Sequence, residues 1–151
     1  MSLEAVIAAI EAAFAGVTLG GGVGLQQAQG IDDYADAATC AYFREGDEKD
    51  DWRRIPASEL NHCNSSLSFF DAEGMRFHLP AYLVAELRGT YGFNLVFCLI
   101  DLSDYRCDQL AMLSAAQRSA VRAFLLHLAD HARYRYERLA IIAALDSYWG
   151  P

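Results

Sequence analysis

Two histidines near the C-terminal end have the type and spacing of a metal-binding pair. His127 and His131 are four residues apart in a segment whose apolar spacing predicts a helix, so both rings would project from one face. A zinc site needs three or four protein ligands, so another ligand, such as His62, Cys63 or His78, would have to come from elsewhere. A metal-binding protein or enzyme using His127 and His131 is therefore one hypothesis. Solvent-exposed helical histidines are the simpler explanation.

The other reactive side chains have no geometry fixed by the sequence. His62 and Cys63 hold the two members of a thiol–imidazole dyad, but adjacent residues rarely meet productively in one element. Six aspartates form two groups that could support acid–base chemistry or bind magnesium: Asp32, Asp33 and Asp36, and Asp101, Asp104 and Asp108. Helix caps and solvated loops account for these acids more simply. We expect no cofactor and no catalytic residue.

The glycine-rich stretch "TLGGGVG" (18–24) raises the question of phosphate binding. The phosphate loop of nucleotide hydrolases places Lys and Ser or Thr directly after its last glycine, whereas Leu25 and Gln26 follow here. A dinucleotide-binding loop follows a buried strand, whereas this stretch follows a predicted helix. We therefore predict a sharp turn between two helices and no phosphate site.

Acidic residues are concentrated in the first half of the chain. The net charge is −8; residues 1–75 carry 13 acidic and 4 basic residues, and residues 76–151 carry 7 acidic and 8 basic residues. Segment 32–51 alone holds eight acids beside Arg44 and Lys49. Such a surface repels nucleic acids and anionic membranes and suits a basic partner. A solvated surface that keeps the protein soluble is the alternative explanation.

Arginines and tyrosines alternate in "ARYRYERL" (132–139), a composition that can bind single-stranded nucleic acid. Residues two apart on a helix do not share a face, and the overall negative charge opposes nucleic-acid binding. We therefore expect these arginines to pair with the acidic 32–51 region, within the chain or across a dimer.

The charge pattern favours a non-enzymatic interaction domain that binds a basic protein, by analogy with small bacterial immunity and antitoxin proteins. The expected contacts are Asp47, Glu48, Asp50, Asp51 and Trp52. Tyr34 and Tyr42 are further candidate aromatic anchors. We expect no nucleic-acid or membrane partner, and both a monomer and a homodimer remain open.

Length and composition predict one globular domain over residues 1–151. The chain is 54% apolar and 21% charged. No apolar run approaches the roughly 20 residues of a membrane-spanning helix, and Glu4 and Glu11 stand where a signal peptide would be basic. Four cysteines without a close pair indicate free thiols. A cytoplasmic protein is expected.

The predicted fold class is α+β, mostly helical with a small antiparallel sheet. Helices are expected at 3–15, about 32–44, near 56–60, at 80–89 and, from a Ser114–Gln117 capping box, over most of the C-terminal segment. The stretch "LSFFDAEGMRFHLP" predicts a hairpin at about 67–79, with Gly74 in its turn and Pro80 opening the next helix. Residues 94–100 are expected to form a third strand, although periodicity alone leaves a buried helix open there.

Four pieces of the sequence carry a resemblance to a known family. They are "IDDY" (31–34), Trp52 with "IP" (55–56), "LSFFDAEGMRFHLPAYL" (67–83) and "LSAAQRSAVRAFL" (113–125). In this order they resemble an uncharacterised bacterial domain family of unknown function, over roughly residues 25–130. The resemblance implies the α+β architecture described above and no assigned activity.

Overall fold

The computed structural model describes all residues 1–151 and consists of helices and loops, with no strand. The α-helices are α1 (Leu3–Ala13), α2 (Leu25–Asp32), α3 (Ala37–Gly46), α4 (Ala57–His62), α5 (Ala72–Leu87), α6 (Val96–Ile100), α7 (Asp104–Leu110), α8 (Ala115–Ala129) and α9 (Arg138–Asp146). Single 3-10 turns cover Trp52–Arg54, Ser66–Ser68 and Ala132–Tyr134. The predicted α+β class, with its small antiparallel sheet, is therefore wrong.

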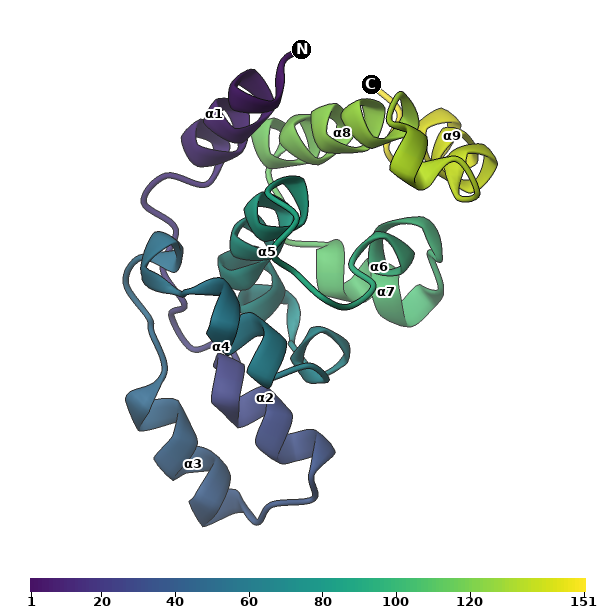
Figure 1. The fold of residues 1–151 in the computed structure, drawn as a ribbon. Helices are drawn as coiled ribbons and strands as arrows, with labels where there is room; N and C mark the ends of the chain where they lie inside the picture. The colour runs from purple at the N-terminus through teal and green to yellow at the C-terminus, as the bar shows by residue number, and fades with distance from the viewer.

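Helix α5 is the centre of the molecule. Helices α1, α4 and α7 pack against it, and Figure 1 shows it between α1 and α8 on one side and α2 and α4 on the other. Eleven of its 16 residues are buried, so it has no wide solvent-facing side. A helix buried on all sides does not show the apolar stripe of a surface helix.

The predicted hairpin at 67–79 is occupied by the start of α5. The Asp71 carboxylate accepts a hydrogen bond from the Gly74 N–H, which makes Asp71 the N-cap of the helix. Gly74 lies in the first helical turn, and the alternation in "MRFHL" extends over too few residues to specify a strand. Pro80 lies inside the helix and does not open it.

The third predicted strand, 94–100, is also wrong, because residues 96–100 form α6. The helix predicted at about 32–44 begins later, as α3 at Ala37, after a turn at residues 33–36, and α2 over Leu25–Asp32 was not predicted. Asp36, not Asp32, caps α3, accepting from the Thr39 N–H. The Ser2 cap of α1 and the Ser114–Gln117 capping box of α8 are both present as predicted.

The core is one cluster of 36 buried residues that runs from Val6 to Trp149. Helix α3 contributes no residue to this cluster; its one buried residue is Cys40, and it packs mainly on α2. Helix α3 therefore projects from the body at the lower end of Figure 1, whereas α2, beside it, contributes Leu25 and Ala28 to the core. No helix has both the length and the apolar character required to cross a membrane.

Candidate functional site

The projecting helix α3 and the turns on either side of it contain most of the acidic segment identified in the sequence. We call residues 32–51 the acidic arm; it comprises the end of α2, the whole of α3 and the loop leading to Trp52. Its exposed side chains include four acids and two tyrosines: Asp33, Asp36, Glu45, Asp50, Tyr34 and Tyr42. The position of the arm outside the core leaves these groups accessible from several directions.

Tyr34 lies at the tip of the arm in a strained backbone conformation. Its φ of 60° makes it the one non-glycine residue with a positive φ, and its side chain is 95% exposed. The Tyr34 N–H binds the carbonyl of Ile31 and the Ala35 N–H binds that of Gly30. This is the Schellman arrangement that ends helices, and Tyr34 stands where glycine is usual. Nothing in the fold uses the ring, so the strain at Tyr34 has no evident structural benefit.

One face of α3 is open to solvent along its whole length. Ala38, Ala41, Tyr42 and Glu45 follow the i, i+3, i+4, i+7 pattern and are all exposed. Tyr42 is 72% exposed. The two alanines leave a shallow strip beside the Tyr42 ring, over which another chain could approach closely.

Three of the four predicted contact acids hold the backbone of their own chain. Asp47 is only 8% exposed, and its Oδ1 and Oδ2 accept the Gln26 and Gln27 N–H groups at 2.8 and 3.1 Å, at the start of α2. Burial raises the pKa of the Asp47 carboxyl, and these two hydrogen bonds oppose the increase. Glu48 accepts from the N–H groups of Asp50 and Asp51.

Asp51 caps the 3-10 turn through the Arg53 N–H and forms an ion pair with the Arg53 guanidinium at 3.1 Å. Of the four acids, only Asp50 has a carboxylate without a hydrogen-bonding role, and it is exposed. Of the four acids predicted to contact a partner, three therefore stabilise the fold of their own chain and only Asp50 is a free surface carboxylate.

Trp52 belongs to the core and not to the surface. Its side chain is 4% exposed, and its indole N–H donates to the Phe14 carbonyl at 3.1 Å, which ties the end of α1 to the loop after the arm. Its use as a surface anchor is corrected accordingly. The exposed aromatic residues of the arm are Tyr34 and Tyr42.

All but one of the acids of the arm lack an ion-pair partner within the chain. Arg44 donates to the carbonyls of Gly20 and Gly22, and Lys49 donates to those of Glu45 and Asp47. The single ion pair of the molecule is the one between Arg53 and Asp51. The expectation that the arginines of 132–139 pair with the arm inside one chain is therefore wrong, whereas pairing across a dimer is not tested.

The glycine-rich loop is a structural joint between the arm and α5. The Gly21 and Val23 N–H groups donate to Glu73 Oε2 and Asp71 Oδ1, at 3.2 and 3.0 Å. A Cβ atom on Gly22 would lie 2.7 Å from the Gly74 nitrogen. A phosphate-binding loop would offer its backbone N–H groups to the ligand, but here the Asp71 and Glu73 carboxylates already accept two of them. These two acids of "DAEG" therefore hold the loop against the start of α5.

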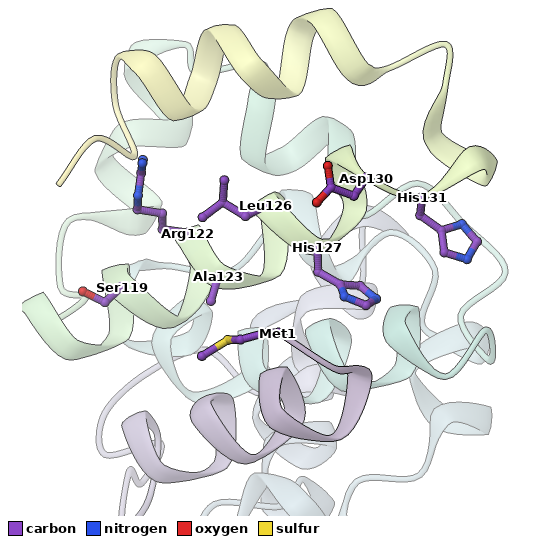
Figure 2. A pocket seen from close by; sticks show the side chains of 8 residues that line it. All are labelled: Met1, Ser119, Arg122, Ala123, Leu126, His127, Asp130 and His131. Atoms are coloured by element: carbon purple, nitrogen blue, oxygen red, sulfur yellow. The ribbon is translucent and has the colours of Figure 1, made fainter.

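The His127–His131 pair does not lie on one helix. Helix α8 ends at Ala129, and His131 follows in extended backbone, with its Nδ1 accepting the Arg133 N–H. Both side chains line a groove of about 470 Å³. Figure 2 shows the His127 ring directed toward α1 and the His131 ring farther along, beyond the end of α8. No group of three or more His, Cys, Asp or Glu side chains is arranged to hold a metal ion. The shared helical face, on which the metal hypothesis rested, is absent.

Two of the four thiols, Cys63 and Cys98, are in environments that disfavour nucleophilic chemistry. Burial raises the pKa of the Cys63 thiol to about 11 and also raises that of Cys98. All four cysteines are free. Cys63 therefore holds almost no thiolate at neutral pH, although His62 is its neighbour in the chain.

A row of buried polar side chains along α5 was not predicted from the sequence. His78, Tyr82 and Glu86 follow at i, i+4 and i+8 and are 0 to 5% exposed. His78 is stacked on Phe70, its Nδ1 binds the Gly74 carbonyl at 2.7 Å, and burial lowers its pKa to about 4. Glu86 accepts from the Tyr134 hydroxyl at 2.9 Å. The spacing of four residues would indicate that these side chains share one face of a helix, but the segment that contains His78 was predicted to be a strand.

The fold and these surfaces define a small all-helical protein with a projecting acidic arm. Residues 2–151 match the family described as Family of unknown function (DUF6714), and the chain belongs to that family. The resemblance noted in the sequence, to a family without an assigned activity, is thus confirmed. No curated protein and no solved structure matches the chain.

Proposed function

We propose that this protein is a non-enzymatic interaction domain whose acidic arm binds a basic segment of a partner protein. The observation that carries the proposal is Tyr34, a fully presented aromatic side chain held in a left-handed conformation at the tip of the arm. A tyrosine in this conformation costs about 1–2 kcal/mol relative to glycine. A binding role for the Tyr34 ring explains why a tyrosine occupies this position despite the conformational cost.

The chemistry of the arm supports two kinds of contact. Tyr34 and Tyr42 offer large, amphipathic rings, the residue type that dominates binding energy in protein interfaces. Asp33, Glu45 and Asp50 are exposed carboxylates, and the last two have no hydrogen-bonding partner in the chain. They would attract and orient a lysine- or arginine-rich partner, mainly by increasing the association rate.

The comparison with bacterial immunity and antitoxin proteins is part of this proposal and rests on surface chemistry alone. A cytoplasmic location is a further part of it, and the four free thiols are typical of a reducing compartment.

Partner capture by a tagged protein tests the role of charge. We expect a basic protein to be retained from a lysate of the source cells at about 50 mM salt and released at about 500 mM, because salt screens exposed charges. The variant Glu45→Lys/Asp50→Lys should lose the partner. The matched control Asp101→Lys/Asp108→Lys makes the same change of net charge on exposed residues outside the arm and should retain it. Equal loss in both variants would show that net charge, and not the arm, is responsible.

Tyr34→Gly tests the aromatic contact separately. Glycine relieves the strain, so we expect the melting temperature to rise by about 2–4 °C while partner retention falls. Phe97→Ala removes a half-exposed aromatic ring outside the arm, on α6, and should leave retention unchanged. Undiminished binding by Tyr34→Gly would remove the main support for the proposal.

A further inference from the structure

Helix α9 has an apolar face that the rest of the chain leaves uncovered. Between its first residue, Arg138, and its last, Asp146, the sequence is "LAIIAAL", without a polar residue. Only Ile141, Ala144 and Leu145 are buried. A helix that is apolar on all sides is normally buried on all sides. Here α8 and α6 cover one side, and Figure 1 shows α9 at the edge of the molecule.

The uncovered face has the shape of a helix-packing surface. Leu139, Ile142, Ala143 and Asp146 follow the i, i+3, i+4, i+7 pattern, and Leu139 and Ile142 are 83% and 41% exposed. Beside it lies a groove of about 510 Å³ between α8 and α9, with Leu126 in its wall. Figure 2 shows Leu126 and Asp130 projecting from α8 into the space below α9.

The charges at the two ends of α9 oppose its own dipole. Arg138 lies at the positive N-terminal end and Asp146 at the negative C-terminal end, which is the unfavourable order for an isolated helix. Neither residue has an ion-pair partner, since the molecule contains only the Arg53–Asp51 pair. The Arg138 Nε donates to the Ala129 carbonyl at 2.7 Å, and the two terminal nitrogens of its guanidinium make no hydrogen bond. A second α9 laid antiparallel would bring Asp146 of each copy close to Arg138 of the other and would oppose the two dipoles.

We propose that this face forms a symmetric homodimer in which two antiparallel α9 helices cross at Ile142. Ile142 is the midpoint of the helix, so a two-fold axis there brings Leu139 of each copy toward the groove beside Leu126 of the other. Such a two-fold contact is self-complementary and closed. The interface lies at the end of the molecule remote from α3, so it leaves both acidic arms free (Figure 1).

The dimer should be of moderate affinity. Two nine-residue helices and the flanking grooves form a small interface, for which a Kd in the micromolar range is expected. Sedimentation velocity and light scattering of the full chain between about 1 and 200 μM should therefore show a concentration-dependent change from monomer to dimer. A wild-type protein that stays monomeric over this range would overturn the proposal.

Two substitutions test the apolar centre. Ile142→Glu and Leu139→Glu each place like charges near the two-fold axis and should give monomers throughout the concentration range. Both side chains face solvent, so we expect native helix content by circular dichroism. Ile31→Glu, on a similarly exposed residue of α2, is the matched control and should still dimerise. Dimers of normal affinity from both α9 variants would rule out this interface.

A charge exchange tests the antiparallel orientation. Arg138→Glu and Asp146→Lys should each weaken dimerisation roughly tenfold, because each change creates two repulsive contacts in a symmetric dimer. The double variant Arg138→Glu/Asp146→Lys restores opposite charges across the interface and should recover most of the affinity. If the effects of the two changes simply add, the two residues do not meet, and the antiparallel arrangement is wrong.

Discussion

Acidic residues that are alike in the sequence have different functions in the arm. The Asp47 carboxylate is buried and binds two backbone N–H groups at the start of α2, whereas the Asp50 carboxylate is exposed and unpaired. A carboxylate at a helix N-terminus satisfies donors that have no partner within the helix. Net charge alone therefore overstates how many acids are available for a partner.

Alanine substitutions should separate the two functions. Asp47→Ala leaves the Gln26 and Gln27 N–H groups without their acceptor, so we expect the free energy of unfolding to fall by about 2 kcal/mol. Asp50→Ala should change it by less than about 0.5 kcal/mol, as exposed substitutions usually do. Urea unfolding of the two variants measures both values. A similar loss of stability in both variants would contradict the division into structural and surface carboxylates.

At the scale of elements, the glycine-rich loop and the start of α5 form one joint. Asp71 caps α5 through Gly74 and also binds the Val23 N–H, so a single carboxylate joins the helix to the loop. Close approach of the two backbones requires small residues at Gly22 and Gly74. The position of the whole arm relative to the core depends on this joint.

Two alanine substitutions in the loop should differ strongly. A Cβ atom at Gly22 would lie 2.7 Å from the Gly74 nitrogen and 2.8 Å from Glu73 Cβ, so Gly22→Ala must displace the backbone, and we expect a loss of about 2 kcal/mol or more. Gly21 has open space around its Cβ position, and Gly21→Ala should be neutral or slightly stabilising. Thermal and urea unfolding of the pair test this, and equal stability of both variants would argue against the joint.

At the scale of the whole molecule, the core encloses ionisable groups that couple folding to pH. His78 is neutral because burial lowers its pKa to about 4, from an ordinary value of 6.5. Because the folded pKa lies below the unfolded one, the unfolded chain binds the proton first as the pH falls. The contribution of His78 to stability is therefore present above about pH 6.5 and decreases toward pH 4.

This coupling predicts a loss of roughly 2 kcal/mol in the free energy of unfolding between pH 7 and pH 5 from His78 alone. Burial raises the pKa of Glu86 and Asp47, and these groups act in the opposite direction, so the effect must be isolated by comparison. His78→Phe should show a pH dependence that is shallower by that amount. His62→Phe, on an exposed histidine, should follow the wild type. Parallel curves for wild type and His78→Phe would contradict a neutral buried imidazole.

The sequence by itself determined what depends on neighbouring residues in the chain. The Ser2 cap and the Ser114–Gln117 capping box are local signals, and both helices start where these signals place them. The acidic character of segment 32–51 and the departure from a phosphate-loop motif are also properties of the sequence alone. Caps and charges act within about one helical turn, which is why they could be recognised without a fold.

The tertiary structure decided which side chains are buried and which helices and loops bury them. The sequence of the first half of α5 predicts a hairpin, because the helices packed around α5 bury it on nearly all sides and so remove the periodicity of a surface helix. Trp52 became a core residue and Asp47 a helix cap through contacts with Phe14 and Gln26, 38 and 21 residues away. Burial and these long-range hydrogen bonds depend on the arrangement of the helices in space. That arrangement left Tyr34 and the outer face of α9 as the surfaces with no partner in the chain.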